Sequence, residues 1–515
     1  MTKITRKDFL RLSSAMAATA GLGACATTTT AAASAPATAK APSTSGKLLI
    51  KNADVLTMNA GRDEVMATDV LVENGKITTI GKGLSAPDAE IIDAAGMILM
   101  PGMVDGHRHV WESMEAGRLT KFHASKYSST YQQWKMRTIV CLTPEEMYLS
   151  GLIGGLQAID TGVTTVLDYA HGQVNQENAV ASAKGLQDSG IGGWFGFQLG
   201  VSSSYGPGDT VDLEAAHAQR VAKTTETHWA TADALKRDVF TDPDAILQLG
   251  LCPASGVGDP LDLIKEEWTR ARSYGLGILG AHIHKPATPF PAGYMGHRGS
   301  GMLDLADAGM LGPDYHISHA NRLTEDELMV LRETGGMICA TAMGEFPYMT
   351  SEHRGPSCHG RARAAGVAAG IGVDVSLALT QDYFEHVRAG FWNLYLSPEG
   401  TDIVTDYQAY DAMDFAANFG AKAVRLDNVV GSIETGKRAD LLLVKTDRAT
   451  FGRLGTLAER VVTFAAREDI DSVFIAGKAR KRHGQLVDVD MPALMQKVYA
   501  AQDRYGPLAA TIKFV

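Results

Sequence analysis

Residues 101–109 read Pro-Gly-Met-Val-Asp-Gly-His-Arg-His, and this stretch decides the fold and the chemistry expected of the chain. The apolar run at 97–100 is of strand type, and Pro101-Gly102 interrupts it. His107 and His109 stand two residues apart, and residues i and i+2 of an extended strand point to the same face. Both imidazoles can therefore reach one metal ion, although a His-x-His pair alone is weak evidence for a metal site.

The bulk composition is that of a soluble globular protein rather than a nucleic-acid-binding protein. The chain has 515 residues, 45% of them hydrophobic, so more than one folding unit is expected. The formal charge of -10 argues against a nucleic-acid groove as the main surface. The five cysteines show no Cys-x-x-Cys spacing, so neither a disulfide framework nor a structural zinc module is indicated.

The first 46 residues are expected to serve export and not the fold. Residues 1–25 resemble a twin-arginine export signal in which Lys7 replaces the second arginine, and they end in a stretch similar to a bacterial lipobox at Cys25. Residues 26–46 are rich in Ala, Thr, Ser and Pro and read as a flexible tether. We expect a periplasmic lipoprotein held at the membrane only through a lipidated Cys25. A cleaved secretory signal without lipid is the alternative.

The rest of the chain divides into three parts. Residues 47–97 hold short alternating strands, with Asn74-Gly75 as a hairpin turn. Residues 98–427 alternate apolar strands with helical stretches, and about eight strand-helix units fit this span. Residues 428–515 return to strand character before a C-terminal helix. The pattern predicts an α/β fold: a (β/α)8 TIM-like barrel with a small β-sandwich built from both chain ends.

Two motifs resemble the amidohydrolase superfamily. Pro-Gly-x-Val-Asp followed by His-x-His is similar to the first barrel strand of that superfamily, whose paired histidines bind a catalytic divalent metal. Residues 431–441, Gly-Ser-Ile-Glu-Thr-Gly-Lys-Arg-Ala-Asp-Leu, resemble a second family hallmark, which is structural. Asp374 with its downstream sequence is similar to the triazine-hydrolase and cytosine-deaminase-like branch. The resemblance covers nearly the whole mature chain and implies a hydrolase of small molecules, for which a homodimer is plausible.

The resemblance also implies a set of site residues at the ends of barrel strands. His107 and His109 would bind the metal, and Asp374, after the apolar run at 371–373, would be both a ligand and the general base. Strand 6 offers two histidines. The family's His-x-Asn element matches His319, which would orient the water or stabilise an oxyanion, whereas His316 is expected to pack.

Strand 5 offers two candidate metal ligands. His282 and His284 share a strand face, so strand phase cannot separate them. The distance from the helix-ending Gly275 favours His282, while the family string His-x-His-x-x-Glu-Thr favours His284. Both remain candidates, with His282 slightly preferred.

One departure from the family pattern bears on the reaction. Deaminases of this family carry a glutamate three residues after the strand-5 histidine, but here those positions are Lys285 or Ala287. Glu345 is a substitute candidate, and an ordinary surface acid is the alternative interpretation. The stretch at 246–253 has no lysine to bridge two metals, so one divalent ion is expected, with zinc favoured and iron(II) as the alternative.

The sequence therefore predicts a metal-dependent hydrolase that uses an activated water on a non-peptide carbon–nitrogen bond of a cyclic or amide-type small molecule. Trp111, Glu112 and His353 are expected to line the substrate site, with His171 as a weaker candidate, and a core role is the alternative for Trp111. A heterocycle deaminase is the second hypothesis. An inactive lipoprotein that binds a small molecule is the third.

Overall fold

Gly102 separates two strands that belong to different sheets. In the computed structural model, β5 (Met97–Pro101) pairs with the terminal strands, while β6 (Met103–Arg108) begins the barrel. A Cβ atom at Gly102 would lie 2.1 Å from Oγ1 of Thr164, so only glycine lets the chain pass here. The barrel thus starts after Pro101, later than the boundary at residue 98 expected from the sequence, because the apolar run at 97–100 pairs with the other sheet.

The structure describes residues 46–118, 124–212, 223–283, 301–321, 323–345, 357–396 and 407–515. Within these ranges, no helix is long and apolar enough to cross a membrane.

Eight parallel strands form the barrel that the sequence predicts. They follow one another in chain order as β6, β7 (Val163–Ala170), β8 (Gly192–Gln198), β10 (Leu247–Cys252), β11 (Leu279–Ile283), β12 (Tyr315–His319), β13 (Met337–Ala340) and β14 (Ala368–Ile371). The last strand is joined to the first by a parallel bridge between Arg108 and Asp374. The Tyr383 hydroxyl donates to the carbonyls of Val104 and Ile371, which ties the two strands together.

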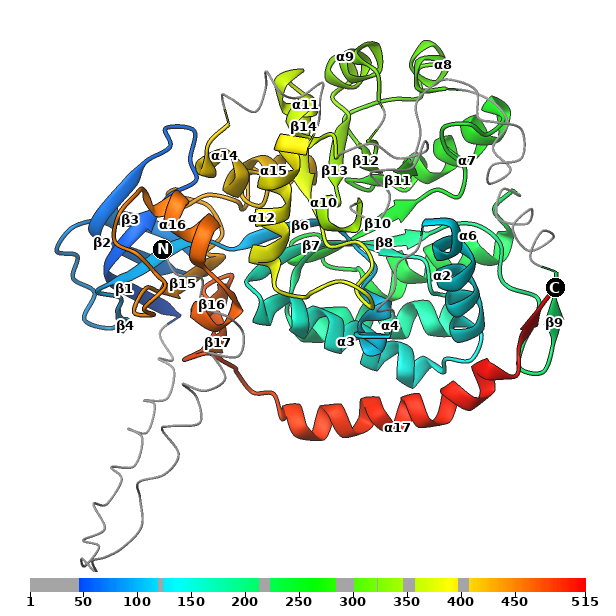
Figure 1. Ribbon diagram of the computed structural model, residues 1–515, viewed down its shortest axis with the longest axis horizontal. Helices are drawn as coiled ribbons and strands as arrows, with labels where there is room; N and C mark the ends of the chain where they lie inside the picture. The colour runs from blue at the N-terminus through cyan, green and yellow to red at the C-terminus, as the bar shows by residue number, and fades with distance from the viewer. Residues whose placement is uncertain are drawn as a thin grey trace, which may run out of the picture. The chain divides into compact units, whose positions relative to one another are not determined.

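Helices alternate with these strands and surround the barrel (Figure 1). They are α2 (Ala124–Ile139), α3 (Pro144–Asp160), α4 (Gln176–Ser189), α6 (Glu226–Ala234), α7 (Leu261–Ser273), α8 (Met302–Asp307), α9 (Glu325–Thr334), α10 (Ala342–Glu345), α11 (His359–Ala364), α12 (Tyr383–Asn393), α14 (Ala409–Asp414) and α15 (Asn418–Ala423). Helix α9 begins with the expected capping box: Thr324 accepts from the Glu327 amide, and the Glu327 carboxylate accepts from the Thr324 amide.

The two chain ends share one mixed sheet, as the sequence predicts. Its path runs β18 (Gln485–Leu486), β17 (Lys478–Arg482), β16 (Ile470–Ile475), β15 (Leu441–Lys445), β5, β1 (Lys47–Leu56), β2 (Glu64–Glu73) and β3 (Lys76–Gly81), with β4 (Glu90–Asp93) on β1. Figure 1 shows the blue and orange strands lying side by side. Asn74 and Gly75 form the β2–β3 turn with φ of 52° and 77°, as an Asn-Gly hairpin requires.

Two further helices come from the C-terminal part: α16 (Leu457–Phe464) and α17 (Met491–Ala510). Helix α17 contacts the first βα segment of the barrel, where its Tyr505 hydroxyl donates to Glu115 and its Gln502 side chain donates to the Met114 carbonyl. The strand β19 (Lys513–Phe514) then pairs with β9 (Thr210–Val211). The end of the chain is therefore fastened to a loop that follows β8.

Candidate metal centre

Four barrel strands bring histidine and aspartate side chains together where they end. Nε2 of His107 lies 3.5 Å from Oδ1 of Asp374, and Nε2 of His109 lies 3.2 Å from the same oxygen. Nε2 of His282 lies 3.0 Å from Nε2 of His107. His107 also forms a second cluster with His319 and Asp374, and within each cluster the ligand atoms lie within 4.8 Å of one another. The structure thus joins the sequence-predicted residues of strands 1, 5, 6 and 8.

The backbone turns sharply at two of these residues. His319 has a φ of 75° and Asp374 a φ of 71°, in the left-handed region that is uncommon for residues other than glycine, although histidine and aspartate adopt it more often than most. Side chains alternate along a strand, so a regular β12 would direct Ser318 and His319 to opposite faces. The left-handed conformation ends this alternation and lets both residues face the centre. Backbone strain of this kind persists where the surrounding structure holds it, commonly at functional sites.

Hydrogen bonds fix the orientation of three rings. Nδ1 of His109 donates to the Tyr169 carbonyl at 2.9 Å. Nδ1 of His107 pairs with the Ser318 hydroxyl at 2.8 Å, and Nδ1 of His319 with the Thr341 hydroxyl at 2.9 Å. In each case the other ring nitrogen, Nε2, faces the metal centre. Partners of this type set ring tautomer and raise ligand basicity in metal sites.

The protonation states of His107 and Asp374 suit a cation. Burial lowers the pKa of His107 to about 3, so this ring is neutral. Burial also acts on Asp374, but the charge of His319 and the hydrogen bonds from His107 and His109 outweigh it and hold the carboxyl pKa well below its usual range. For His109, burial is likewise outweighed by Asp374 and Glu112, which raise its pKa. An ionised carboxylate thus lies among buried imidazoles.

This donor set fits one divalent metal ion. Two ring nitrogens that face each other at 3.0 Å repel through their lone pairs unless a proton or a cation lies between them. The centre offers imidazole nitrogens and one carboxylate, which are ligands that zinc and iron(II) both accept. The Tyr169 ring stacks on His282 with centroids 3.8 Å apart and holds that ring in place.

Comparison with known families agrees with this centre. Residues 98–480 match the model of the amidohydrolase family. The chain belongs to this family. A 5-methylthioadenosine/S-adenosylhomocysteine deaminase of Symbiobacterium thermophilum is 25% identical over 414 residues, which cover 78% of this chain and 86% of the relative. A 5'-deoxyadenosine deaminase of Methanosarcina mazei is 24% identical over 466 residues, which cover 88% of this chain and 98% of that one.

Solved structures share the fold of this amidohydrolase. An adenosine deaminase from Xanthomonas campestris with bound zinc matches with a TM-score of 0.74 at 19% identity, over 89% of this chain and 98% of that one. An atrazine chlorohydrolase from Arthrobacter aurescens complexed with zinc matches with a TM-score of 0.72 at 18% identity, over 88% and 99%. Family and site together make the protein a metal-dependent amidohydrolase that acts on carbon–nitrogen bonds other than peptide bonds.

Two sequence-predicted lining residues of the amidohydrolase are buried beside the centre. Trp111 stacks on Trp134 with centroids 5.3 Å apart, and its indole nitrogen donates to Nδ1 of His171. A Cβ atom at Gly172 would lie 2.5 Å from the Trp111 ring, so this ring is covered on that side as well. This placement favours the core interpretation of Trp111 that the sequence left open.

Glu112 is also fully buried. Burial raises the pKa of its carboxyl to about 7, against the charge of His109 and a hydrogen bond from the Tyr131 hydroxyl to Oε1. The other oxygen, Oε2, has no hydrogen-bond partner among the described residues. A buried acid of this kind lies directly behind the metal ligands.

Other predicted residues fall partly or wholly outside the described ranges. His284, His353 and Cys25 lie outside them, and among the described residues His282 is the strand-5 histidine at the centre. Glu345 ends α10, and only its backbone is described.

His316 is buried, and burial lowers its pKa to about 3. Neither ring nitrogen has a hydrogen-bond partner among the described residues, which is consistent with the packing role expected from the sequence.

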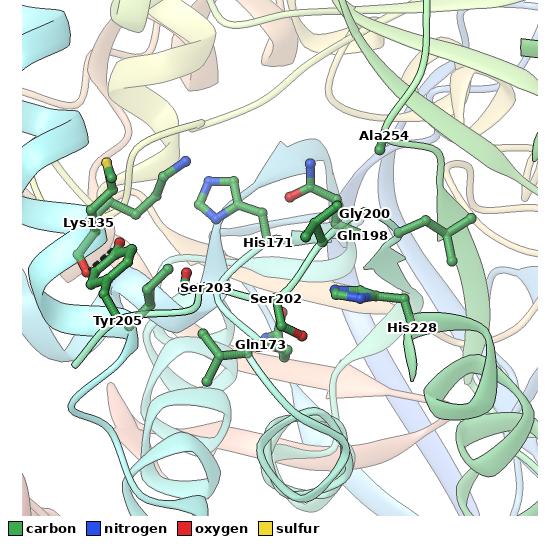
Figure 2. Close-up of a pocket in the computed structure, with 15 residues that line it drawn as sticks. Lys135, His171, Gln173, Gln198, Gly200, Ser202, Ser203, Tyr205, His228 and Ala254 are labelled. Atoms are coloured by element: carbon green, nitrogen blue, oxygen red, sulfur yellow. Dashed lines mark hydrogen bonds between the residues drawn. The ribbon is translucent and has the colours of Figure 1, made fainter. Parts of the chain in front are cut away.

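A cavity opens beside the metal centre, at the carboxyl ends of β7, β8 and β10 (Figure 2). His171 forms part of its wall, and the same ring stacks on His109 with centroids 3.9 Å apart. The polar side chains around it come from α2, α6, the end of β8 and the loops after β7 and β8: Lys135, His171, Gln173, Gln198, Ser202, Ser203, Tyr205 and His228. We refer to it as the β7–β10 cavity.

Sequence reasoning missed the residues that support the ligands. Ser318 and Thr341 orient two histidines, and Lys135 and Gln173 line the β7–β10 cavity. Ser318 lies one residue before His319 in a His-x-x-His segment, and this position could have indicated a supporting role. The sequence gives no such indication for Lys135, because its helix lies within a long βα connection whose course depends on tertiary packing.

Proposed function

We propose that this amidohydrolase is a zinc-dependent aminohydrolase that releases ammonia from an adenosine-like heterocycle. The observation that carries the proposal is the convergence of His107, His109, His282 and Asp374 on one point, with His319 beside them. Relatives that match most of the chain are deaminases of 5'-modified adenosines, and two structural neighbours hold zinc. This favours the deaminase hypothesis over hydrolysis of a cyclic amide.

The residues present divide the work of such a reaction. A divalent metal, when bound, supplies the Lewis-acid chemistry that makes water nucleophilic near neutral pH. Asp374 accepts a proton from the attacking water, because its carboxylate is held ionised. The Thr341 hydroxyl pairs with Nδ1 of His319 and directs Nε2 toward the centre, where this ring can stabilise the negative charge that develops when water adds to the attacked carbon.

The proton for the leaving amine needs a donor, since the usual glutamate is replaced by Lys285 or Ala287. We assign this role to Glu345. The preceding residue, Gly344, lies against the centre: a Cβ atom there would be 3.2 Å from Oδ2 of Asp374. The chain therefore passes the general base one residue before Glu345. Glu345→Gln should lower kcat by about 100-fold or more while metal content stays stoichiometric.

Ammonia release tests the proposal directly. The zinc-loaded full chain is assayed with adenosine, 5'-deoxyadenosine, 5'-methylthioadenosine and S-adenosylhomocysteine, with Asp374→Asn as the inactive control. We expect ammonia from at least one of them and a loss of about 100- to 10,000-fold in kcat for Asp374→Asn. Absence of ammonia with all four, together with hydrolysis of a cyclic amide, would instead support the broader carbon–nitrogen hydrolase.

We further propose that the enzyme is exported and anchored by a lipid on Cys25. Support comes from the signal-like residues 1–25, the cysteine at the end of the lipobox-like stretch and the polar tether at 26–46. Expression of the full chain should place it in the membrane fraction, with a diacylated N-terminal peptide by mass spectrometry. Cys25→Ala should release it. A soluble wild-type protein with an unmodified N-terminus would refute the anchor.

A further inference from the structure

The β7–β10 cavity adjoins the metal centre and has room for the part of a substrate that is not attacked. His171 belongs to both, because it lines the cavity and stacks on the ligand His109. The wall opposite comes from α2 through Lys135, Met136 and Ile139. The cavity and the metal ligand His109 are therefore separated by a single side chain, that of His171.

One lysine lies in the cavity wall among the described residues. Lys135 is only 4% exposed, and Figure 2 shows its side chain extending along the cavity toward His171. Among the described residues that line the cavity there is no aspartate or glutamate. His228, on the far wall, is neutral at physiological pH because burial lowers its pKa to about 4. The charge of Lys135 also acts on Glu112, which lies outside the lining.

A buried acceptor in the same wall has no partner. Gln173 is 7% exposed, and its side-chain nitrogen donates to the Ser182 hydroxyl at 3.3 Å. Its Oε1 atom has no hydrogen-bond partner among the described residues. An unsatisfied buried acceptor is unfavourable, and a ligand N–H or O–H group would satisfy it. Ser202 and Ser203 add further hydroxyl groups to the lining.

We propose that this cavity selects substrates whose non-reacting part carries an acidic group, a carboxylate or a phosphate, together with a hydrogen-bond donor. Lys135 pairs with the anion, and Gln173 accepts from the donor. Because Lys135 is buried, its attraction for an anion is stronger than that of an exposed ion pair, where water screens the charges. This inference rests on the proposed function, and it names the class of substrate within it: an acidic derivative of the heterocycle rather than the neutral parent.

Binding of product-type ligands tests the charge preference without turnover. Isothermal titration of the zinc-loaded enzyme compares inosine with inosine 5'-monophosphate, and S-inosylhomocysteine with 5'-methylthioinosine. We expect the acidic member of at least one pair to bind tighter by at least about tenfold. The phosphate pair and the carboxylate pair separate the two sources of negative charge. Equal binding within both pairs, tighter binding of the neutral members, or no binding at all overturns the inference.

Variants assign the preference to the named residues. Lys135→Met should abolish the preference for acidic ligands, and Lys135→Arg should keep it. Gln173→Leu should lower the affinity for the acidic ligand by about tenfold. Lys184→Met is the matched control, because Lys184 carries the same charge on the exposed surface of α4. Circular dichroism and metal content verify that each variant is folded. A preference that survives in folded Lys135→Met refutes the role of Lys135, whereas failure of all ammonia assays bears on the proposed function alone.

Discussion

The Nε2 atom of His282 lies 3.0 Å from the Nε2 atom of His107. This pair links β11 to β6 across the barrel and favours His282 as the strand-5 ligand, the residue that the sequence slightly preferred over His284. His282→Ala should weaken zinc binding by more than about 100-fold, since loss of outer partners alone costs 10- to 100-fold. His284→Ala should keep stoichiometric zinc. Metal analysis after dialysis against a chelator checks both, and the reverse result would move the ligand to His284.

The hydroxyls of Ser318 and Thr341 hold two rings of the centre. We expect Ser318→Ala to weaken zinc binding by about 10- to 100-fold, because His107 loses the partner that fixes its tautomer. Ser376→Ala is the matched control, since the Ser376 hydroxyl is buried and has no partner among the described residues. Zinc affinity is measured by competition with a chromogenic chelator. Equal losses in both variants would indicate a packing effect instead.

A buried histidine remote from the metal should make the fold sensitive to acid. Burial lowers the pKa of His359 from 6.5 to about 4, against the hydrogen bond between its Nε2 and the Gly390 carbonyl. A depressed pKa contributes stability that is present above pH 6.5 and is lost as pH falls toward 4. At about pH 5 the loss from this one group is about 2 kcal/mol relative to neutral pH.

His359→Gln removes this titration. The free energy of unfolding of the wild type should therefore fall by about 2 kcal/mol more than that of the variant between neutral pH and pH 5. Urea unfolding of both proteins at the two pH values measures the difference, and the other buried histidines cancel in the comparison. A parallel fall in the two proteins would mean that the pKa of His359 is the same in the folded and unfolded states.

Sequence reasoning reached the fold and the ligand-bearing strand ends because both are local patterns. The strand-8 prediction shows the limit. The sequence placed Asp374 directly after an apolar run at 371–373, but β14 ends at Ile371 and the chain adopts the left-handed conformation at Asp374. There it lies against β6, at the start of the barrel, through the bridge between Arg108 and Asp374. No local pattern reports such a contact between residues this far apart in the sequence.

The C-terminal segment braces the wall of the β7–β10 cavity. The Arg137 guanidinium of α2 donates to the Ile512 carbonyl at 3.0 Å, and the Gly208 amide donates to the Thr511 hydroxyl at 2.8 Å. The same two elements carry cavity residues, and the Tyr205 hydroxyl joins them by donating to the Met136 carbonyl at 3.0 Å. The tail therefore connects α2 with the loop after β8.

Removal of residues 511–515 should loosen this wall and leave the metal centre intact. We expect KM for the substrate of the deamination to rise by up to about tenfold. The value of kcat and the zinc content should stay nearly unchanged, because the metal ligands and Asp374 do not lie on the segments that the tail contacts. Removal of Val515 alone, which is 79% exposed, is the control and should change KM little. Steady-state ammonia release measures both constants, and hydrogen exchange should increase in the 199–212 loop. A fall in kcat at constant KM would show instead that the tail supports the reacting groups.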